Sequence, residues 1–189
     1  LGAMLRRTNH YCFMNLKQPM LDRAIESTAA SQAPGIPAHL HLDNLKALVS
    51  REKGDKDPAV SNSCFSQAFK QLRDKDSAVF RYVFSGDRSF QITFDGESGI
   101  DAGGVFREGV SQIVEDIFSD TVDLFILCPN GQHNVHMNCE KFVPNPSYTS
   151  TTTMEMYEFV GKLMGMSIRT KLLLPFEFPP LIWKALVGE

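Results

Sequence analysis

One segment of the chain restricts the possible folds more than any other. Phe90, Ile92 and Phe94 alternate with polar residues, which predicts a half-buried β-strand. Four glycines follow within residues 95–104 and predict a turn. Apolar residues then recur at helical spacing over residues 106–117, opposite a charged face, which predicts an amphipathic helix. A strand joined by a turn to a helix indicates an α+β domain.

Other segments carry shorter patterns of the same two kinds. We expect further strands at residues 39–42, 79–84, 124–127 and 134–138, the last two forming a hairpin. We expect further helices after the cap residue Asp43, after Ser61 or Asn62, over residues 154–171 behind Thr153, and from Pro179-Pro180 onward.

The chain divides into an arm, a linker and a body. Residues 1–26 have apolar residues at helical spacing and predict a helical N-terminal arm, which Pro19 interrupts early. Residues 27–37 are rich in small residues and contain two prolines and a glycine, which is typical of a linker. Residues 38–189 hold the remaining patterns, so we expect one folded domain there.

Charge and hydropathy argue against several functions. The formal net charge is -3, so no general basic field attracts nucleic acid or anionic lipid. The apolar run 172–176 contains Pro175 and is far shorter than the roughly 20 residues of a membrane helix. Residues 1–7 lack a signal-peptide pattern. We therefore expect no nucleic-acid partner and no membrane span.

The four cysteines predict reduced thiols. Cys12, Cys64, Cys128 and Cys139 are irregularly spaced and form no CxxC pair. A chain of this size does not need a disulfide framework, so we expect a cytoplasmic protein, with the nucleus as the other compartment left open. None of these cysteines adjoins a Lys/Arg cluster that would lower its pKa.

The glycine-rich turn is the sharpest local motif. We expect Gly96 to permit a tight turn, Asp101 to accept N–H groups at the helix start, and Gly103-Gly104 to let another backbone come close. The glycines fit neither G-x-x-x-x-G-K-[ST] nor G-x-G-x-x-G, which argues against a phosphate site. Phe106 stands where an EF-hand needs a bidentate carboxylate, which argues against calcium. A structural turn is the better interpretation.

A second cluster has the residue types of a zinc site. Cys128, His133, His136 and Cys139 lie within twelve residues and are all suitable donors. The spacing does not match a zinc knuckle, and on a strand His136 and Cys139 would point to opposite faces. We therefore predict no metal and no cofactor, and keep zinc as an alternative.

Acid–base and nucleophilic sites are also not indicated. There is no G-x-S-x-G nucleophile pattern. The carboxylate pairs Glu115/Asp116 and Glu155/Glu158 lie on polar helix faces, where we expect a solvated surface. The residues by themselves indicate a soluble α+β domain without a complete active site.

Five segments together resemble one protein family. Residues 94–108, Phe-Asp-Gly-Glu-Ser-Gly-Ile-Asp-Ala-Gly-Gly-Val-Phe-Arg-Glu, closely resemble the signature near the start of the HECT domain, found in ubiquitin ligases that form a thioester with ubiquitin. The other segments resemble parts of that domain in the family's order: residues 63–72, 124–130 with 142–146, 157–168 and 174–188. Together they cover about residues 38–189.

The resemblance implies a mostly helical HECT N-lobe with short strands or hairpins, preceded by the arm. The implied function is the scaffold portion of an E3 ubiquitin-protein ligase, which passes ubiquitin through a cysteine thioester to a substrate lysine. In this family the acceptor cysteine follows a threonine and precedes a Leu-Pro run, a context that none of the four cysteines has. We therefore expect a partial N-lobe, without the E2-binding subdomain and the C-lobe, that is inactive alone.

The residues that match the family motifs receive structural roles, and none is assigned as catalytic. They are Gly96, Glu97, Asp101, Gly103 and Gly104 at the turn, Arg107 and Glu108 as polar ties to neighbouring elements, and Gly161 and Gly165 for close helix packing.

The implied partners are a ubiquitin-conjugating enzyme (E2) and ubiquitin, which act through the complete domain, and protein substrates. The apolar face of the arm adds self-association as a further expectation. The alternative function is a non-catalytic interaction module from a short or truncated product, in which the arm and the lobe bind other proteins.

Overall fold

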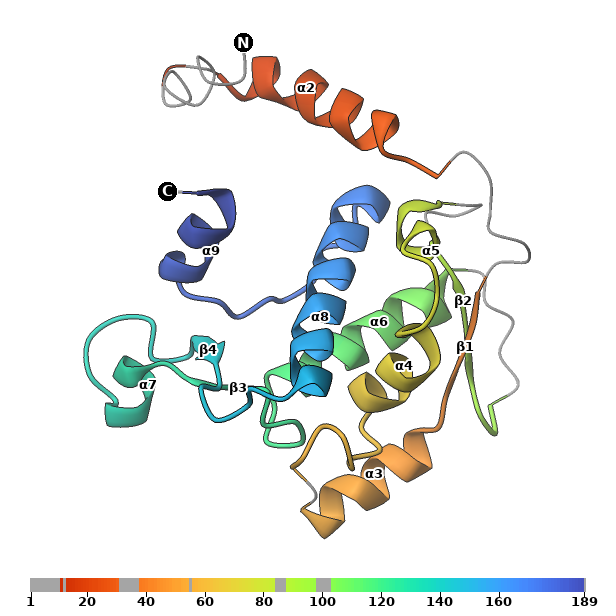
Figure 1. Cartoon of the computed structure of the whole chain (residues 1–189), viewed down its shortest axis with the longest axis vertical. Coiled ribbons are helices and arrows are strands. Elements are labelled where there is room, and N and C mark those ends of the chain that lie inside the picture. The colour runs from red at the N-terminus through yellow and green to blue at the C-terminus, as the bar shows by residue number, and fades with distance from the viewer. Residues whose placement is uncertain are drawn as a thin grey trace.

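The computed structural model describes residues 11, 13–30, 38–54, 56–83, 88–97 and 103–188. The longest helix, α8 (Thr151–Thr170), runs through the centre of the molecule in Figure 1. The helices α4 (Cys64–Leu72) and α5 (Ala78–Arg81) lie on one side of it, and α6 (Gly104–Ile117) extends from that side. The predicted α+β fold class is confirmed.

The first sheet is a parallel pair that follows from two alternating segments. The strand β1 (His39–Leu42) pairs with β2 (Gln91–Phe94) so that Leu40 lies beside Ile92 and Leu42 beside Phe94. All four of these side chains are buried. A parallel pair needs a crossover connection, which here contains α3 (Asn44–Lys53), α4 and α5.

The second sheet is an antiparallel pair on the other side of α8. The strand β3 (Phe125–Leu127) pairs with β4 (Phe142–Pro144), and Ile126 lies opposite Val143. The short helix α7 (Pro129–His133) lies between them in the chain. The predicted strand over 134–138 is wrong: Asn134, His136 and Asn138 have positive φ angles, which a strand does not allow.

Side-chain caps explain where three helices begin. Asp43 accepts a hydrogen bond from the backbone N–H of Lys46 and starts α3, as predicted. Ser63 caps α4, a position beyond the predicted Ser61 or Asn62. Ser150 caps α8 by accepting from the Thr153 N–H, so α8 begins three residues before the predicted start.

The core is built largely from phenylalanine rings. Phe159 of α8 packs against Phe65, Phe69 and Phe80, with ring centroids 5.8–5.9 Å apart. Such tilted and edge-to-face contacts are the favoured geometry of aromatic pairs. The predicted strand over 79–84 is wrong within residues 79–83, because Val79 and the core residue Phe80 belong to the single turn α5.

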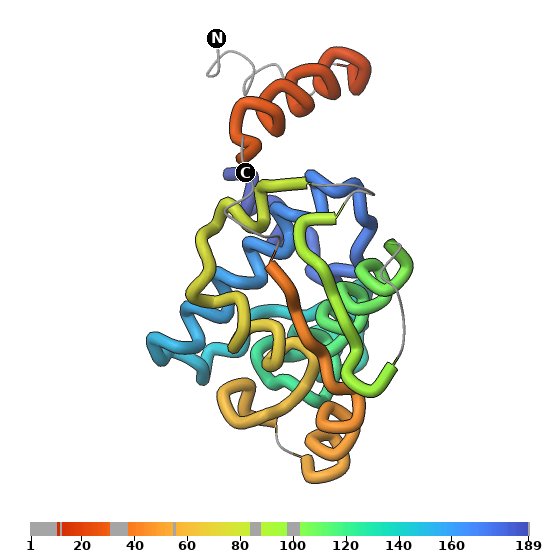
Figure 2. Tube along the Cα trace, turned by 90° about the vertical axis from the view of Figure 1, so that its right-hand side faces the viewer, coloured from red at the N-terminus to blue at the C-terminus, as the bar shows by residue number. Residues whose placement is uncertain are grey.

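The arm and the last helix lie at one end of the molecule, as Figure 2 shows. The arm helix α2 (Met14–Ser27) contains Pro19 without a break, so the predicted interruption is wrong. Arg169 of α8 donates hydrogen bonds to the carbonyl of Ile25 and the hydroxyl of Thr28, which hold the end of α2. The helix α9 (Pro180–Val187) begins at Pro180, as predicted. Residues 31–37 of the expected linker lie outside the described residues.

Candidate functional site

The strand, turn and helix singled out above form the centre of the candidate site. The turn after β2 places Gly96 at a φ of 86°, and Gly103, the N-cap residue of α6, has a φ of 100°. Both values lie in the region that glycine adopts at little cost, so these two glycines are required by backbone conformation. Asp101 lies outside the described residues.

The turn is tied to two neighbouring elements. Glu97 accepts a hydrogen bond at Oε1 from Asn44 Nδ2 of α3 over 3.3 Å. The carboxylate of Asp95 lies 3.4 Å from Nδ1 of His41 on β1. Both contacts are exposed, so each contributes little to stability. They position the turn beside the first turn of α3.

Among the described residues, none of the three expectations for the start of α6 finds support. A Cβ atom on Gly104 would meet none of their atoms within 4 Å. Glu108 accepts its hydrogen bond from Gln112 of the same helix and not from a neighbouring element. Arg107 is exposed, and its side chain forms no hydrogen bond or ion pair with the described residues. The charged face of α6 here points to solvent.

The glycines that pack closely are not those that we expected. Gly161 and Gly165 lie on the exposed side of α8, where an added Cβ would meet nothing within 4 Å. On α6, an added Cβ at Gly109 would lie 2.8 Å from Cδ1 of Ile92. On α7, an added Cβ at Gly131 would collide with the carbonyl oxygen of Cys139. Gly109 therefore sets the distance between α6 and the β1–β2 sheet.

A groove of about 930 Å³ opens beside this junction. It runs between α3 on one side and the beginning of α4 and the end of α6 on the other. Its lining includes Asn44, Leu48, Arg51, Cys64, Gln112 and Asp116. Only Ala47 and Ser50 of α3 are buried, so this wall of the groove is held mainly by polar contacts. This volume lies within the range of small-molecule and cofactor pockets, about 300–1,000 Å³.

Asp116 is a buried charged residue in the lining of the groove. Its burial corrects the expectation of a solvated carboxylate. Its Oδ2 accepts from the backbone N–H of Phe65 over 3.3 Å, and its Oδ1 accepts from Arg51 Nη2 over 3.4 Å. Burial raises the pKa of Asp116, while these donors act in the opposite direction. Its spacing of three residues from Ile113, along the apolar stripe, is the sequence signal for this burial.

Cys64 lies in the groove but is not an activated nucleophile. Burial, and secondarily the nearby carboxylate of Asp116, raise the pKa of its thiol to about 12. Its Sγ lies 3.7 Å from the Gln112 side-chain oxygen and 3.9 Å from that of Asn44. A thiol with this pKa is almost entirely protonated at neutral pH, so it cannot attack a thioester efficiently.

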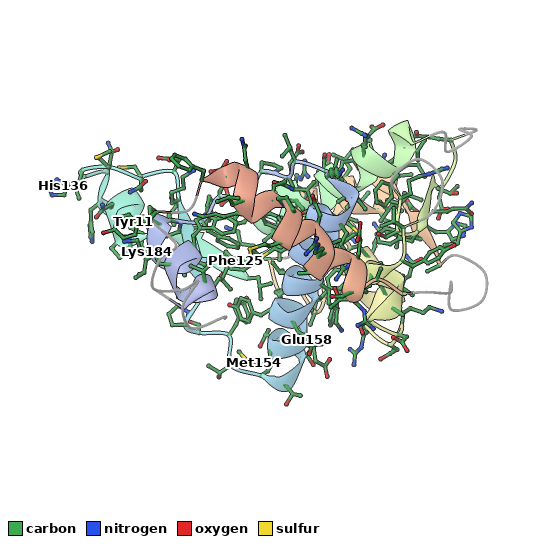
Figure 3. The ribbon with its side chains drawn as sticks, turned by 90° about the horizontal axis from the view of Figure 1, so that it is seen from above. Tyr11, Phe125, His136, Met154, Glu158 and Lys184 are labelled. Atoms are coloured by element: carbon green, nitrogen blue, oxygen red, sulfur yellow. The ribbon has the colours of Figure 1, made fainter. Side chains whose placement is uncertain are left out.

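The thiols near α7 stabilise a loop. Cys128 Sγ donates to the carbonyl of Asn138 over 3.1 Å, and Cys139 Sγ approaches the carbonyls of Val135 and His136. His136 lies at the outer tip of this loop, as Figure 3 shows. Across the described ranges no three His, Cys, Asp or Glu side chains gather as a metal site would require.

Within the same described ranges, no helix is both long enough and apolar enough to cross a membrane. The candidate site consists of a three-helix junction, an open groove and thiols that are buried or directed at backbone carbonyls.

Comparison with known proteins identifies relatives. The model of the family described as HECT-domain (ubiquitin-transferase) matches residues 111–189, from within α6 onward. The human protein named probable E3 ubiquitin-protein ligase HECTD4 is 29% identical over 193 aligned residues, which cover 100% of this chain and 5% of that protein.

Two further relatives carry similar names. The mouse E3 ubiquitin-protein ligase HERC2 is 26% identical over 91% of this chain and 4% of its own length. The E3 ubiquitin-protein ligase TOM1 of Saccharomyces cerevisiae is 33% identical over 52% of this chain and 3% of its own length. The chain thus spans about a twentieth or less of these relatives.

Proposed function

We propose that this chain belongs to the HECT-domain family, whose model matches residues 111–189, and that it is the N-lobe scaffold of an E3 ubiquitin-protein ligase and does not itself carry the acceptor cysteine. The proposed partners are a ubiquitin-conjugating enzyme, ubiquitin and protein substrates, which meet on the complete domain. The proposed compartment is the cytoplasm or the nucleus, because the described cysteines are free thiols.

The state of Cys64 carries this proposal. It is the thiol beside the candidate groove, and its pKa of about 12 keeps it protonated. Cys128 is buried, and both Cys128 and Cys139 direct their sulfur atoms at backbone carbonyls. Cys12 lies outside the described residues, and its neighbours Tyr11 and Phe13 do not match the family's acceptor context.

The chemistry of the complete domain would be two acyl transfers. A thiolate attacks the thioester carbonyl of ubiquitin on the conjugating enzyme, a new thioester forms, and the conjugating enzyme's thiol leaves. The amine of a substrate lysine then attacks this thioester, and the acceptor thiol leaves. The scaffold would contribute by holding the donor, the acceptor and the substrate in register.

Intact mass spectrometry tests the absence of an acceptor. The chain is incubated with activating enzyme, conjugating enzyme, ubiquitin and ATP without reductant, next to a complete HECT ligase as positive control. We expect the mass to stay at 21.1 kDa while the control forms a thiol-labile ubiquitin adduct. A thiol-labile adduct on this chain, lost in one Cys→Ser variant, would overturn the proposal.

A chimera separates the scaffold from a non-catalytic interaction module. Residues 38–188 replace the matching segment of human HECTD4, whose similarity covers the whole chain. A scaffold should allow the chimera to form its thioester and ubiquitinate proteins. A chimera that melts cooperatively but transfers no ubiquitin supports the interaction module.

A further inference from the structure

The strand β3 has one edge that pairs with β4 and one edge that faces away from it. On the paired edge, Ile126 lies opposite β4, and the ladder continues through the N–H of Cys128 and the carbonyl of Leu124. Alternate residues of a strand direct their backbone groups to opposite edges. The outer edge of β3 therefore consists of the N–H and C=O groups of Phe125 and Leu127.

Three of these four backbone groups have no partner in the described part of the chain. The carbonyl of Leu127 accepts a hydrogen bond from Nε2 of Gln132 over 2.8 Å. The N–H and the carbonyl of Phe125 and the N–H of Leu127 form no hydrogen bond with the described residues. A strand edge with free donors and acceptors is a template for another extended segment.

Two other strand edges of the molecule are covered. Gln71 of α4 accepts from the N–H of His41 over 3.0 Å and donates to its carbonyl over 2.6 Å, and Gln67 makes the same two contacts with Asp43. These two amide side chains take the place of a strand beside β1. The outer edge of β4 is also covered, because the carbonyl of Glu177 accepts from a backbone N–H of β4 over 2.8 Å. Among the described residues, the edge of β3 has no such cover.

A cavity of about 200 Å³ lies beside the open edge. All three residues of β3 belong to its lining. Lys56, Ser119 and Asp120 line both this cavity and the groove of about 930 Å³, so the two form one continuous space, the β3 groove. In Figure 1, α3 lies on the side of β3 away from β4, so the β3 groove extends away from the covered edge.

The lining of the β3 groove carries more negative than positive charge. Its charged members are four acidic and two basic residues: Glu115, Asp116, Asp120 and Asp123, and Arg51 and Lys56. Arg51 already pairs with Asp116. Glu115 and Asp120 are exposed, and neither carboxylate forms a hydrogen bond or ion pair with the described residues. This unbalanced charge attracts cationic side chains.

We propose that the β3 groove binds an extended, basic segment of a partner protein, which adds as a strand to the outer edge of β3. The backbone of that segment bonds to Phe125 and Leu127, and its side chains alternate between the two faces of the sheet. Lysine or arginine side chains on one face meet the carboxylates of Glu115 and Asp120. The alternating donors and acceptors favour a polypeptide over a small molecule, because an extended backbone matches them. The inference is independent of the ligase assignment.

A nuclear magnetic resonance titration of the nitrogen-15-labelled full chain tests the binding. The probe is a capped peptide of alternating lysine and valine residues. We expect saturable shifts of the amide signals of Phe125 and Leu127. A matched peptide with glutamate in place of lysine should bind roughly tenfold more weakly, because its charges are repelled. If the lysine peptide leaves both amide signals unshifted, or if the glutamate peptide binds as tightly, the proposal is wrong.

Backbone methylation of the peptide tests the addition of a strand. One version carries N-methyl groups on all lysines, and the other carries them on all valines. Only alternate residues of an added strand bond to its neighbour, so one version should bind roughly tenfold more weakly and the other should retain its affinity. Equal affinities of the two versions would show that the peptide does not add to β3 as a strand.

A charge reversal in the chain tests the role of the carboxylates. Asp120→Lys should weaken the binding of the lysine peptide by roughly threefold or more, because a repulsion replaces an attraction. Glu26→Lys makes the same change at an exposed residue of α2, outside the β3 groove, and should leave the affinity unchanged. Both positions are exposed, so both variants should melt as the wild type does. Equal affinities of the Asp120→Lys variant and the wild type would overturn the proposal.

Discussion

The carboxylate of Asp116 caps the beginning of α4, because its Oδ2 accepts a hydrogen bond over 3.3 Å from the backbone N–H of Phe65. The first N–H groups of a helix have no partner within the helix, and they favour a negative charge. Arg51 of α3 approaches the other oxygen over 3.4 Å. One buried side chain of α6 therefore joins three helices that surround the groove.

Removing this carboxylate should destabilise the fold. We expect Asp116→Ala to lower the free energy of unfolding by about 2–3 kcal/mol, because a buried helix N–H loses its acceptor and Arg51 loses its counter-charge. Urea denaturation measures the change. The matched control is Glu115→Ala at the adjacent exposed position, which should change the stability by less than about 0.5 kcal/mol. Equal effects of the two variants would contradict the role of Asp116.

The raised pKa of Asp116 predicts a dependence of stability on pH. The unfolded chain releases this proton near the ordinary pKa of 3.8, before the folded chain does as the pH rises. The contribution of Asp116 to stability is therefore fully present below that value and is lost as the pH rises through the folded pKa. Relative to Asp116→Asn, the wild type should gain stability as the pH falls from 7 towards 4. A difference that stays constant or falls over this range would show that the folded pKa is not raised.

Gly103 and Gly104 should respond differently to substitution. Gly103→Ala should cost about 1–3 kcal/mol, because a φ of 100° is unfavourable for any side chain, and Gly103→Val should cost at least as much. Gly104→Ala should be neutral or stabilising, because its Cβ would meet nothing and its φ is not positive. Chemical denaturation of both variants checks the order. If Gly103→Ala is as stable as the wild type, the left-handed conformation is not required.

Two glycines inside helices should give opposite signs. Gly161→Ala should stabilise the protein by about 0.5–1 kcal/mol, because alanine is the better helix former and the position is open. Gly109→Ala should destabilise it by about 1–3 kcal/mol, because the new methyl group would press on Ile92. Thermal melting measures both. If Gly161→Ala destabilises the protein, Gly161 packs closely against a neighbour after all, as the sequence predicts.

The thiol of Cys64 should resist alkylation in the folded protein. With a pKa of about 12, roughly one thiol in ten thousand is ionised at pH 8. Iodoacetamide followed by peptide mass mapping should label Cys64 only after denaturation. Cys139 is more exposed and serves as the internal comparison. Labelling of native Cys64 at the rate of Cys139 would mean that the groove exposes a reactive thiol.

Several elements could be predicted because local interactions determine them. The alternation of Ile92 and Phe94 and the stripe from Phe65 to Leu72 correspond to β2 and α4, since strand and helix periods follow from backbone geometry alone. Asp43 caps α3 through a bond to Lys46, only three residues away. The resemblance to the HECT family could also be seen in the sequence, because it rests on the order of short motifs. The HECT family model matches residues 111–189.

The candidate site could be predicted only in part. The positive φ values of Gly96 and Gly103 support the turn that the glycines indicate, but Gly161 and Gly165 prove to be exposed. A sequence does not state which side of a buried helix faces a neighbour. The charge of Asp116 therefore predicts an exposed side chain, although Asp116 lies on the same buried face of α6 as Ile113 and Ile117.

Local patterns in the sequence were enough to predict the periodic elements and the turn glycines, because these depend on residues a few positions apart. The tertiary structure alone decided that Val79 and Phe80 form a helical turn under α8, that Gly109 is the close contact with the sheet, and that Asp116 joins three helices. Each of these outcomes depends on atoms that lie far away in the chain and meet only after folding. A buried N–H without an acceptor, or an unfilled space beside an aromatic ring, costs free energy only once the chain has folded.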